Sequence, residues 1–206
     1  MAYQKNTITY TSNDRGKGGG GLYTVGGRIE ENIFENTFKY IDGKGNALTI
    51  KYDGINSYLS PFFFNHNTFI KCNGEDVRCF DIYLSRLDGE CSEIMNITVR
   101  DCPEASALTG TIEIVNPYCG EIVFKECKWI NNTVLGSVGG GCGLSMKTPN
   151  SFDIYFESNC LFENNTADDG KGGALQIGCD DDPSQYSVYI RSCAFRSNKA
   201  LEGTLS

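Results

Sequence analysis

Large apolar residues recur along this chain at intervals close to 30 residues, and they fill three columns. The first column comprises Ile8, Phe38, Phe69, Val99, Trp129, Phe162 and Phe195. The second comprises Leu22, Leu48, Phe80, Ile112, Leu144, Leu175 and Leu205, followed two residues later by Ile50, Ile82, Ile114, Met146 and Ile177. The third comprises Ile33, Phe64, Ile94, Phe124, Phe156 and Ile190. Local alternation of side chains, as in Leu175-Gln176-Ile177, predicts a short strand at each column.

This repeat predicts the fold class. Three strands in each unit of 30 to 34 residues are typical of a parallel β-helix, in which like residues of successive coils stack. A helical repeat would need a 3.6-residue period with caps, and a propeller blade would need four antiparallel strands. We therefore expect one all-β domain over residues 1–206, with about seven coils, the last of them incomplete.

A short motif recurs within the repeat. Its best copy joins Phe162-Glu163-Asn164-Asn165 to Gly172-Gly173-Ala174-Leu175, and weaker copies start at Phe64, Trp129 and Phe195. The motif resembles the Phe-x-x-Asn and Gly-Gly-Ala-[Ile/Leu/Val] repeat of the polymorphic outer membrane proteins of chlamydiae and of similar protist surface proteins. The resemblance implies a right-handed, pectin-lyase-like parallel β-helix that serves adhesion or forms a passenger stalk.

The motif positions also predict interior ladders. We expect the aromatic and aliphatic residues of the first column to be buried and stacked, from Phe69, Val99 and Trp129 to Phe162 and Phe195. The asparagine three residues later can bond stacked backbone groups, which predicts a ladder of Asn132, Asn165 and Asn198, with Cys72 and Cys102 at this position earlier in the chain. The paired glycines allow a tight turn into the next strand.

The ten cysteines allow two interpretations. An even count suggests a disulfide scaffold. However, Cys127, Cys160 and Cys193 share one column, and thiols in an interior ladder are ordinary core residues. Neighbouring coils would bring stacked Cα atoms within disulfide range, so oxidation is allowed but not required. No CxxC pair occurs and His66 is the only histidine, so we expect neither a metal site nor a cofactor.

The charge balance and the hydropathy of the chain limit the kinds of partner and the location that can be expected. The chain has 18 Lys and Arg against 26 Asp and Glu, a net charge of -8, whereas a nucleic-acid binder needs a basic face. Its longest uncharged run is interrupted by Asn and Gly, so no membrane span is expected. The first residues lack the apolar core of a signal peptide, which favours a cytoplasmic assembly or an upstream segment outside this chain.

Outward positions supply the candidate sites. Phe63, Met95, Val123, Tyr155 and Tyr189 predict a stripe along the third column that contacts a protein or glycan partner. Three formal glycosylation sequons begin at Asn96, Asn131 and Asn164 and would matter in a secreted or cell-surface protein. The alternative to the stripe is that loops cover it.

A carbohydrate-active β-helix enzyme is the sharpest alternative function. Such an enzyme needs outward carboxylates on neighbouring coils, and Asp81 and Glu113 could face the same way. No Arg or Lys column accompanies them, His66 has no nucleophile signature, and the acidic run of residues 180–182 is more typical of a solvated loop than of a calcium site. We therefore assign no catalytic residue.

We expect a non-enzymatic structural or binding repeat protein, adhesin-like and located at the cell surface or outside the cell. An intracellular scaffold with reduced cysteines in a larger assembly remains the second alternative. The chain ends inside its last repeat, which predicts that the strand edge over residues 194–206 is covered by further sequence or by end-to-end stacking with another subunit. A frayed and solvated last coil is the alternative.

Overall fold

The structure is a computed structural model. It describes residues 2–4, 7–9, 12–13, 22–25, 28–30, 33–35, 38–39, 48–53, 63–72, 80–85, 92–102, 110–115, 121–134, 144–148, 152–167, 172–179 and 186–200. Within these ranges every regular element is a strand, none is a helix, and the paired strands run parallel. The described part of the chain is therefore all-β and built of parallel sheets, as the alternating pattern predicts.

Three large sheets contain most of the strands. The first sheet consists, in spatial order, of β1 (Ala2–Gln4), β5 (Arg28–Glu30), β9 (Phe63–Asn65), β12 (Ser92–Met95), β15 (Glu121–Lys125), β19 (Phe152–Glu157) and β23 (Tyr186–Ile190). The second consists of β2 (Thr7–Thr9), β6 (Ile33–Glu35), β10 (Thr68–Ile70), β13 (Thr98–Arg100), β16 (Lys128–Ile130), β20 (Leu161–Glu163) and β24 (Ala194–Arg196). The third consists of β4 (Leu22–Val25), β8 (Leu48–Asp53), β11 (Phe80–Ser85), β14 (Gly110–Val115), β18 (Leu144–Thr148) and β22 (Leu175–Cys179).

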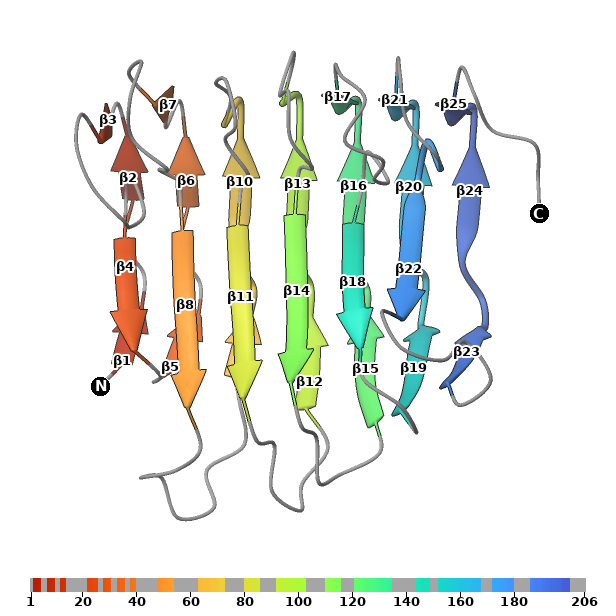
Figure 1. Cartoon of the computed structure of the whole chain (residues 1–206). Helices are drawn as coiled ribbons and strands as arrows, with labels where there is room; N and C mark the ends of the chain where they lie inside the picture. The colour runs from red at the N-terminus through yellow and green to blue at the C-terminus, as the bar shows by residue number, and fades with distance from the viewer. Residues whose placement is uncertain are drawn as a thin grey trace.

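Two short sheets complete the described strands. One contains β3 (Ser12–Asn13) and β7 (Phe38–Lys39), and the other contains β17 (Thr133–Val134), β21 (Thr166–Ala167) and β25 (Lys199–Ala200). Each repeat gives one strand to the first sheet and one to the second, so equivalent strands of successive repeats lie side by side (Figure 1). β1 and β2 lie at one end of the stack, and β23 and β24 lie at the other.

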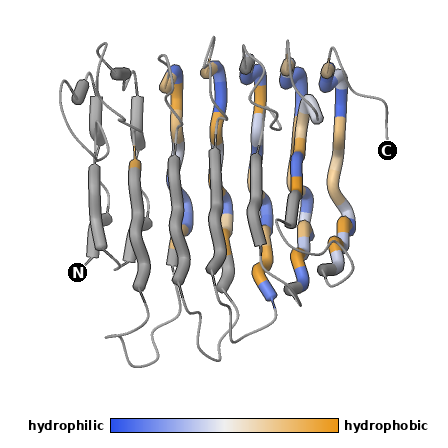
Figure 2. The backbone as a smooth tube through the Cα atoms, in the orientation of Figure 1, coloured by the Kyte–Doolittle hydropathy of each residue, from blue (hydrophilic) through white to orange (hydrophobic). Residues whose placement is uncertain are grey.

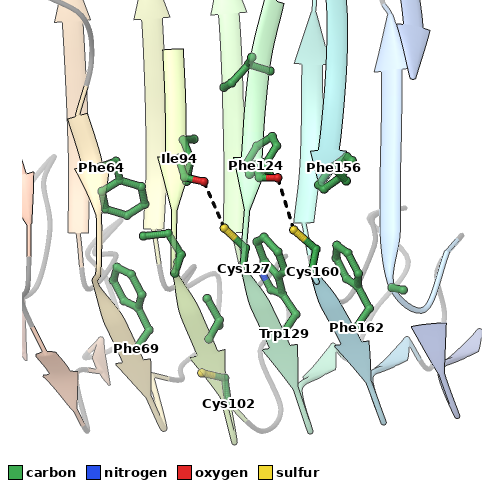
Figure 3. Packing of buried hydrophobic residues seen from close by; sticks show 14 of the residues in the cluster. Phe64, Phe69, Ile94, Cys102, Phe124, Cys127, Trp129, Phe156, Cys160 and Phe162 are labelled. Atoms are coloured by element: carbon green, nitrogen blue, oxygen red, sulfur yellow. Dashed lines mark hydrogen bonds between the residues drawn. The ribbon is translucent and has the colours of Figure 1, made fainter. Parts of the chain in front are cut away.

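The core lies between the sheets and is made of residues that repeat. In β15 and β20 buried residues alternate with partly buried ones, and hydrophobic and hydrophilic residues alternate along coloured parts of the chain in Figure 2, which gives these strands one inward and one outward face. The largest fully buried side chains are Trp129, Phe64, Phe69, Phe124, Phe156, Phe162 and Leu48. Phe124 stacks on Phe156 with ring centroids 4.7 Å apart, and Trp129 stacks on Phe162 at 4.8 Å, each pair joining neighbouring repeats (Figure 3).

The second repeat has a different register from the one predicted. Phe34, and not Phe38, pairs with Ile8 and Phe69 in the second sheet. Likewise Ile29, and not Ile33, pairs with Phe64 in the first sheet. Both predictions were wrong by four residues because this repeat has apolar residues spaced so that either register fills the columns, and the backbone pairing decides between them.

The third sheet is also shifted relative to the prediction. Gly110 lies opposite Phe80, and Ile112 lies opposite Ile82, where Ile114 was expected. A shift of two residues keeps every side chain on its own face, so alternation alone does not fix the register. The last predicted member of this column, Leu205, lies outside the described residues.

The paired glycines behave as the motif predicts. Gly172 has φ +77°, a conformation that L side chains rarely adopt, and an added Cβ would lie 2.7 Å from the carbonyl oxygen of Leu175. A Cβ on Gly173 would overlap the backbone of Lys199 in the next repeat. The first glycine is therefore required by conformation and the second by close packing between repeats.

Candidate interaction surface

The outward row of the first sheet contains most of the predicted stripe. Backbone pairing aligns Phe63, Glu93, Val123, Tyr155 and Tyr189. Met95 does not belong to this row, because it pairs with Lys125, two residues further along the strand. Glu93 occupies its place, so the row is interrupted by an acidic residue and its continuous part runs from Val123 to Tyr189.

Two tyrosines at the end of the row form a stack. The ring centroids of Tyr155 and Tyr189 are 4.6 Å apart and the ring planes differ by 10°. Tyr189 is 36% exposed, and Tyr155 is half-buried. Because neighbouring strands are separated by about 4.8 Å, each ring face is turned toward the other ring. This surface therefore presents ring edges, hydroxyl groups and the far face of Tyr189, on which no described ring is stacked.

An arginine lies across the stack. The guanidinium carbon of Arg191 is 6.0 Å from the ring centroid of Tyr155 and 5.7 Å from that of Tyr189, within the range of a cation–π contact. Its Nη1 atom is 3.5 Å from Oε1 of Glu157, and its side chain is 64% exposed. We call Val123, Tyr155, Tyr189, Arg191 and Glu157 the tyrosine face. Tyrosine and arginine held in place by neighbours are the residues that most often dominate protein interfaces.

Carboxylates border the tyrosine face on one side. Glu121 and Asp153 are paired across β15 and β19, and the Tyr155 hydroxyl lies 3.5 Å from Oδ2 of Asp153. Loss of solvent around the phenol, followed by the negative charge of Asp153, raises the pKa of Tyr155. The Tyr155 hydroxyl therefore stays protonated at neutral pH and can donate a hydrogen bond.

The predicted asparagine ladder is confirmed in detail. Oδ1 of Asn165 accepts from the backbone N–H of Asn132 at 3.2 Å and from Nδ2 of Asn132 at 3.0 Å. Oδ1 of Asn198 accepts in the same way from Asn165, at 3.1 and 2.9 Å. The Nδ2 groups also donate to carbonyl oxygens one repeat back, as Asn165 does to Trp129 at 3.0 Å. Cys102 occupies the equivalent position, since its N–H donates to Oδ1 of Asn132.

The motif copy at Phe64 is not equivalent to the others. Phe64 lies in the first sheet, whereas Trp129 and Phe162 lie in the second. The carbonyl of Asn67 accepts from the N–H of Thr98, which aligns Asn67 with the cysteine column and not with Asn132. Spacing within the motif is the same at both corners of the repeat, so the sequence pattern could not separate them.

The apolar ladder is confirmed for four of its five members. Phe69, Val99, Trp129 and Phe162 are fully buried. Trp129 and Phe162 stack with centroids 4.8 Å apart, and so do Phe162 and Phe195. The predicted burial of Phe195 is wrong, because this ring is 43% exposed. It belongs to the last described repeat, and among the described residues it has a stacking partner on one side only.

The cysteine column lies at a corner between the first and second sheets. Cys127, Cys160 and Cys193 precede β16, β20 and β24, and all are free thiols, as are Cys72 and Cys102. The thiol of Cys127 donates to the carbonyl of Ile94 at 3.4 Å, and that of Cys160 to Phe124 at 3.5 Å (Figure 3). Burial raises the pKa of Cys127 well above its usual value of 9, so this thiol stays protonated and packs as a core residue.

Sequence reasoning missed how the chain turns its corners. In each of the five described repeats from β10 to β24, one residue on each side of the second-sheet strand has φ between 50° and 68°, in the left-handed region, and Ser158 is a further such residue in one of them. The first set comprises His66, Asn96, Glu126, Asn159 and Ser192, and the second comprises Lys71, Asp101, Asn131, Asn164 and Ser197. Asparagine and aspartate tolerate this region better than most residues. Asparagine and aspartate recur at pairs of positions five residues apart, as at Asn96 and Asp101, and this spacing is the sequence signal that could have identified the corners.

The three predicted sequon asparagines all lie at these corners. Asn131 and Asn164 are exposed, and Asn96 is half-buried. Nδ2 of Asn164 donates to Oδ1 of Asn131 at 3.3 Å, and Nδ2 of Asn131 donates to Oδ1 of Asp101 at 3.1 Å. That second bond, together with the adjacent Arg100, lowers the pKa of Asp101. The corner thus carries an outer polar ladder parallel to the buried one.

The carboxylate pair considered for catalysis is not brought into register. Asp81 pairs with Thr111, whereas Glu113 pairs with Tyr83. The two residues are therefore offset by two positions on neighbouring strands. His66 is an exposed corner residue. The run of residues 180–182 lies outside the described residues, and within the described ones no cluster of His, Cys, Asp and Glu suited to a metal ion occurs.

Comparison with protein-family models, with curated proteins and with solved structures finds no match to this chain. Across the described ranges the structure has no helix long and apolar enough to cross a membrane.

Proposed function

We propose that the chain forms a right-handed parallel β-helix of about seven coils that works as a non-enzymatic binding module. The parallel register of successive repeats, the buried asparagine ladder and the outer polar ladder support this fold, and the motif resemblance supports its hand. A stack of rigid repeats provides an extended outer surface that does not need to move in order to bind.

The tyrosine face is the observation that carries the binding function. Tyr155, Tyr189 and Arg191 are held by one another and by Glu157, so little side-chain freedom is lost when a partner binds. The ring faces are turned to each other, which leaves no open aromatic platform for a sugar ring between them. We infer that the partner is a protein, recognised through hydroxyl groups, ring edges and the guanidinium. A glycan remains the alternative partner.

An array experiment tests this proposal. The biotinylated chain is applied to an array of cell-surface ectodomains and to a glycan array, beside a variant carrying Tyr155→Ser, Tyr189→Ser and Arg191→Ser. A control variant carries Lys71→Ser and Lys128→Ser, two exposed residues that lie after and in strands of the second sheet, β10 and β16. Ectodomain binding that the triple variant loses and the control retains supports the proposal. Binding to glycans alone favours the alternative partner, and equal binding by all three chains contradicts the role of this face.

A carbohydrate-active enzyme would make a different prediction. Turnover of polygalacturonate by the chain, lost on Asp81→Asn, would overturn the non-enzymatic proposal. The offset of Asp81 and Glu113 is the reason that we expect no turnover.

We propose a location at the cell surface or outside the cell, with a cytoplasmic scaffold as the alternative. The exposure of Asn131 and Asn164 at sequon positions supports the first location. Intact mass before and after deglycosylation and reduction separates the two. Glycan mass on one or both asparagines supports the surface location, whereas an unmodified and fully reduced chain supports the scaffold.

A further inference from the structure

Three free thiols lie on neighbouring strands at the corner that precedes the second sheet. The N–H of Leu161 donates to the carbonyl of Cys127 at 2.8 Å, and the N–H of Ala194 donates to the carbonyl of Cys160 at 2.9 Å. These bonds continue the register of β16, β20 and β24. Cys127, Cys160 and Cys193 therefore occupy the same position in three successive repeats.

The fold brings Cys127 and Cys160 within the range of a disulfide. Equivalent Cα atoms of neighbouring strands lie about 4.8 Å apart, and disulfides span Cα distances of about 4.4–6.8 Å. The two thiols also point to equivalent carbonyl oxygens, those of Ile94 and Phe124, at 3.4 and 3.5 Å (Figure 3). The two sulfur atoms therefore lie side by side, and closing a bond between them needs side-chain rotation but no change of strand register.

The members of the column differ in how readily they ionise. A hydrogen bond with the Cys127 thiol lowers the pKa of Cys160 to about 7, whereas burial raises the pKa of Cys127 well above its usual value. A thiol hydrogen can turn toward either a carbonyl oxygen or a neighbouring sulfur. Cys193 lowers the pKa of Cys160 less than Cys127 does. Cys160 is therefore the thiol that most readily becomes a nucleophilic thiolate at neutral pH, and Cys127 is its stronger partner.

We propose that Cys127 and Cys160 form a disulfide when the chain folds in the presence of a low-molecular-weight disulfide such as glutathione disulfide. The bond acts as a redox-dependent staple between two successive repeats, which are otherwise joined by backbone hydrogen bonds and side-chain stacking. This role does not depend on the tyrosine face or on the partner that it binds.

The chemistry is thiol–disulfide exchange in two steps. As the corner forms, the Cys160 thiolate attacks one sulfur of glutathione disulfide, and one glutathione leaves as its thiolate. Cys127 then gives its proton to solvent, and its sulfur attacks the Cys160 sulfur and releases the second glutathione. The two cysteines lose two electrons and two protons in total, and glutathione disulfide is reduced to two glutathione thiols. Both steps precede the burial of the corner, because both cysteines are fully buried in the finished stack.

Refolding under two redox conditions tests the pairing. The chain is refolded from urea with glutathione and glutathione disulfide or with dithiothreitol, and the remaining thiols are blocked with N-ethylmaleimide in denaturant. Trypsin places the three cysteines of the column on separate peptides, residues 126–128, 148–171 and 192–196. We expect mass spectrometry of the non-reduced digest to find peptide 126–128 linked to peptide 148–171 after refolding with glutathione disulfide, and to find no such link after refolding with dithiothreitol. A link between peptides 148–171 and 192–196 in its place, or an unlinked peptide 148–171, overturns the proposal.

Urea denaturation followed by circular dichroism tests the staple. The oxidised parent should unfold at a urea concentration about 1–2 M higher than the reduced parent, because the bond constrains the unfolded chain. Cys127→Ala should lose this difference although it keeps every other cysteine, whereas Cys193→Ala, a matched change in the same column, should retain it. Tyr155→Ser should also retain it, which separates the staple from the tyrosine face. If oxidised and reduced Cys127→Ala differ as much as the parent does, another disulfide is responsible and the proposal is wrong.

Discussion

Replacing Asn165 by alanine removes the centre of the buried asparagine ladder. The Asn165 side chain is fully buried and takes part in four hydrogen bonds. Two of them are accepted from Asn132, one is donated to the carbonyl of Trp129, and one is donated to Asn198. Alanine fits the space but can replace none of these bonds.

The cost follows from the groups left behind. The backbone N–H of Asn132, one of its amide hydrogens and the carbonyl of Trp129 each lose a partner in a buried place. A buried polar group left without its partner costs about 1–3 kcal/mol. Allowing for some relaxation, we expect Asn165→Ala to lower the free energy of unfolding by about 4 kcal/mol. That is a large part of the roughly 5–15 kcal/mol typical of a domain.

The preceding residue provides a matched control. Asn164 is exposed, and its side chain makes one hydrogen bond, 3.3 Å long, to Asn131. Because its φ is 53°, Asn164→Ala should cost about 1 kcal/mol through the loss of a side chain that tolerates this conformation.

Urea denaturation measures both variants. Trp129 is the only tryptophan in the chain and is fully buried, so its fluorescence reports unfolding. If Asn165→Ala loses no more stability than Asn164→Ala, the ladder does not stabilise the fold and the reasoning is wrong.

Three further predictions use the same titration. Phe162→Asp should abolish cooperative unfolding, because an unpaired buried charge costs several kcal/mol. Phe195→Asp should lower the free energy of unfolding by only about 2 kcal/mol, because this ring is 43% exposed. Equal losses of stability in the two variants would contradict the difference in burial. Gly173→Ala should cost at least about 2 kcal/mol, because its Cβ would overlap the backbone of Lys199, and a neutral effect would show that the repeats are less closely packed. The pKa of Asp101 is lower in the folded chain than its unfolded value of 3.8, so the charged carboxylate stabilises the fold at pH values above 3.8. This stabilisation is lost as the pH falls through the folded pKa. Asp101→Asn should therefore be less stable than the parent at pH 7, and the difference should shrink as the pH falls through the folded pKa of Asp101; a difference that does not change with pH would refute the assignment.

The buried ladders were predictable because they depend on spacing alone. In the later repeats, residues that recur every 30 to 33 positions do meet when the strands stack in parallel, as Trp129, Phe162 and Phe195 do. This is why Asn132, Asn165 and Asn198, the cysteine column and the stack from Phe69 to Phe162 could be identified from the sequence.

Registers and surfaces depended on the tertiary structure. The second repeat has apolar residues at two positions four residues apart, and Phe34 occupies the place predicted for Phe38. In the third sheet a shift of two residues leaves the alternation unchanged, and Ile112 occupies the place predicted for Ile114. Met95 was misplaced for the same reason. Backbone hydrogen bonds between neighbouring strands, and left-handed corners such as Asn131 that begin and end each short strand, fix these positions. Tyr155 stacks on Tyr189 beside Arg191 because these side chains meet across neighbouring strands. Phe195 is exposed because no described repeat lies beyond it. Neither property can be identified from the local sequence.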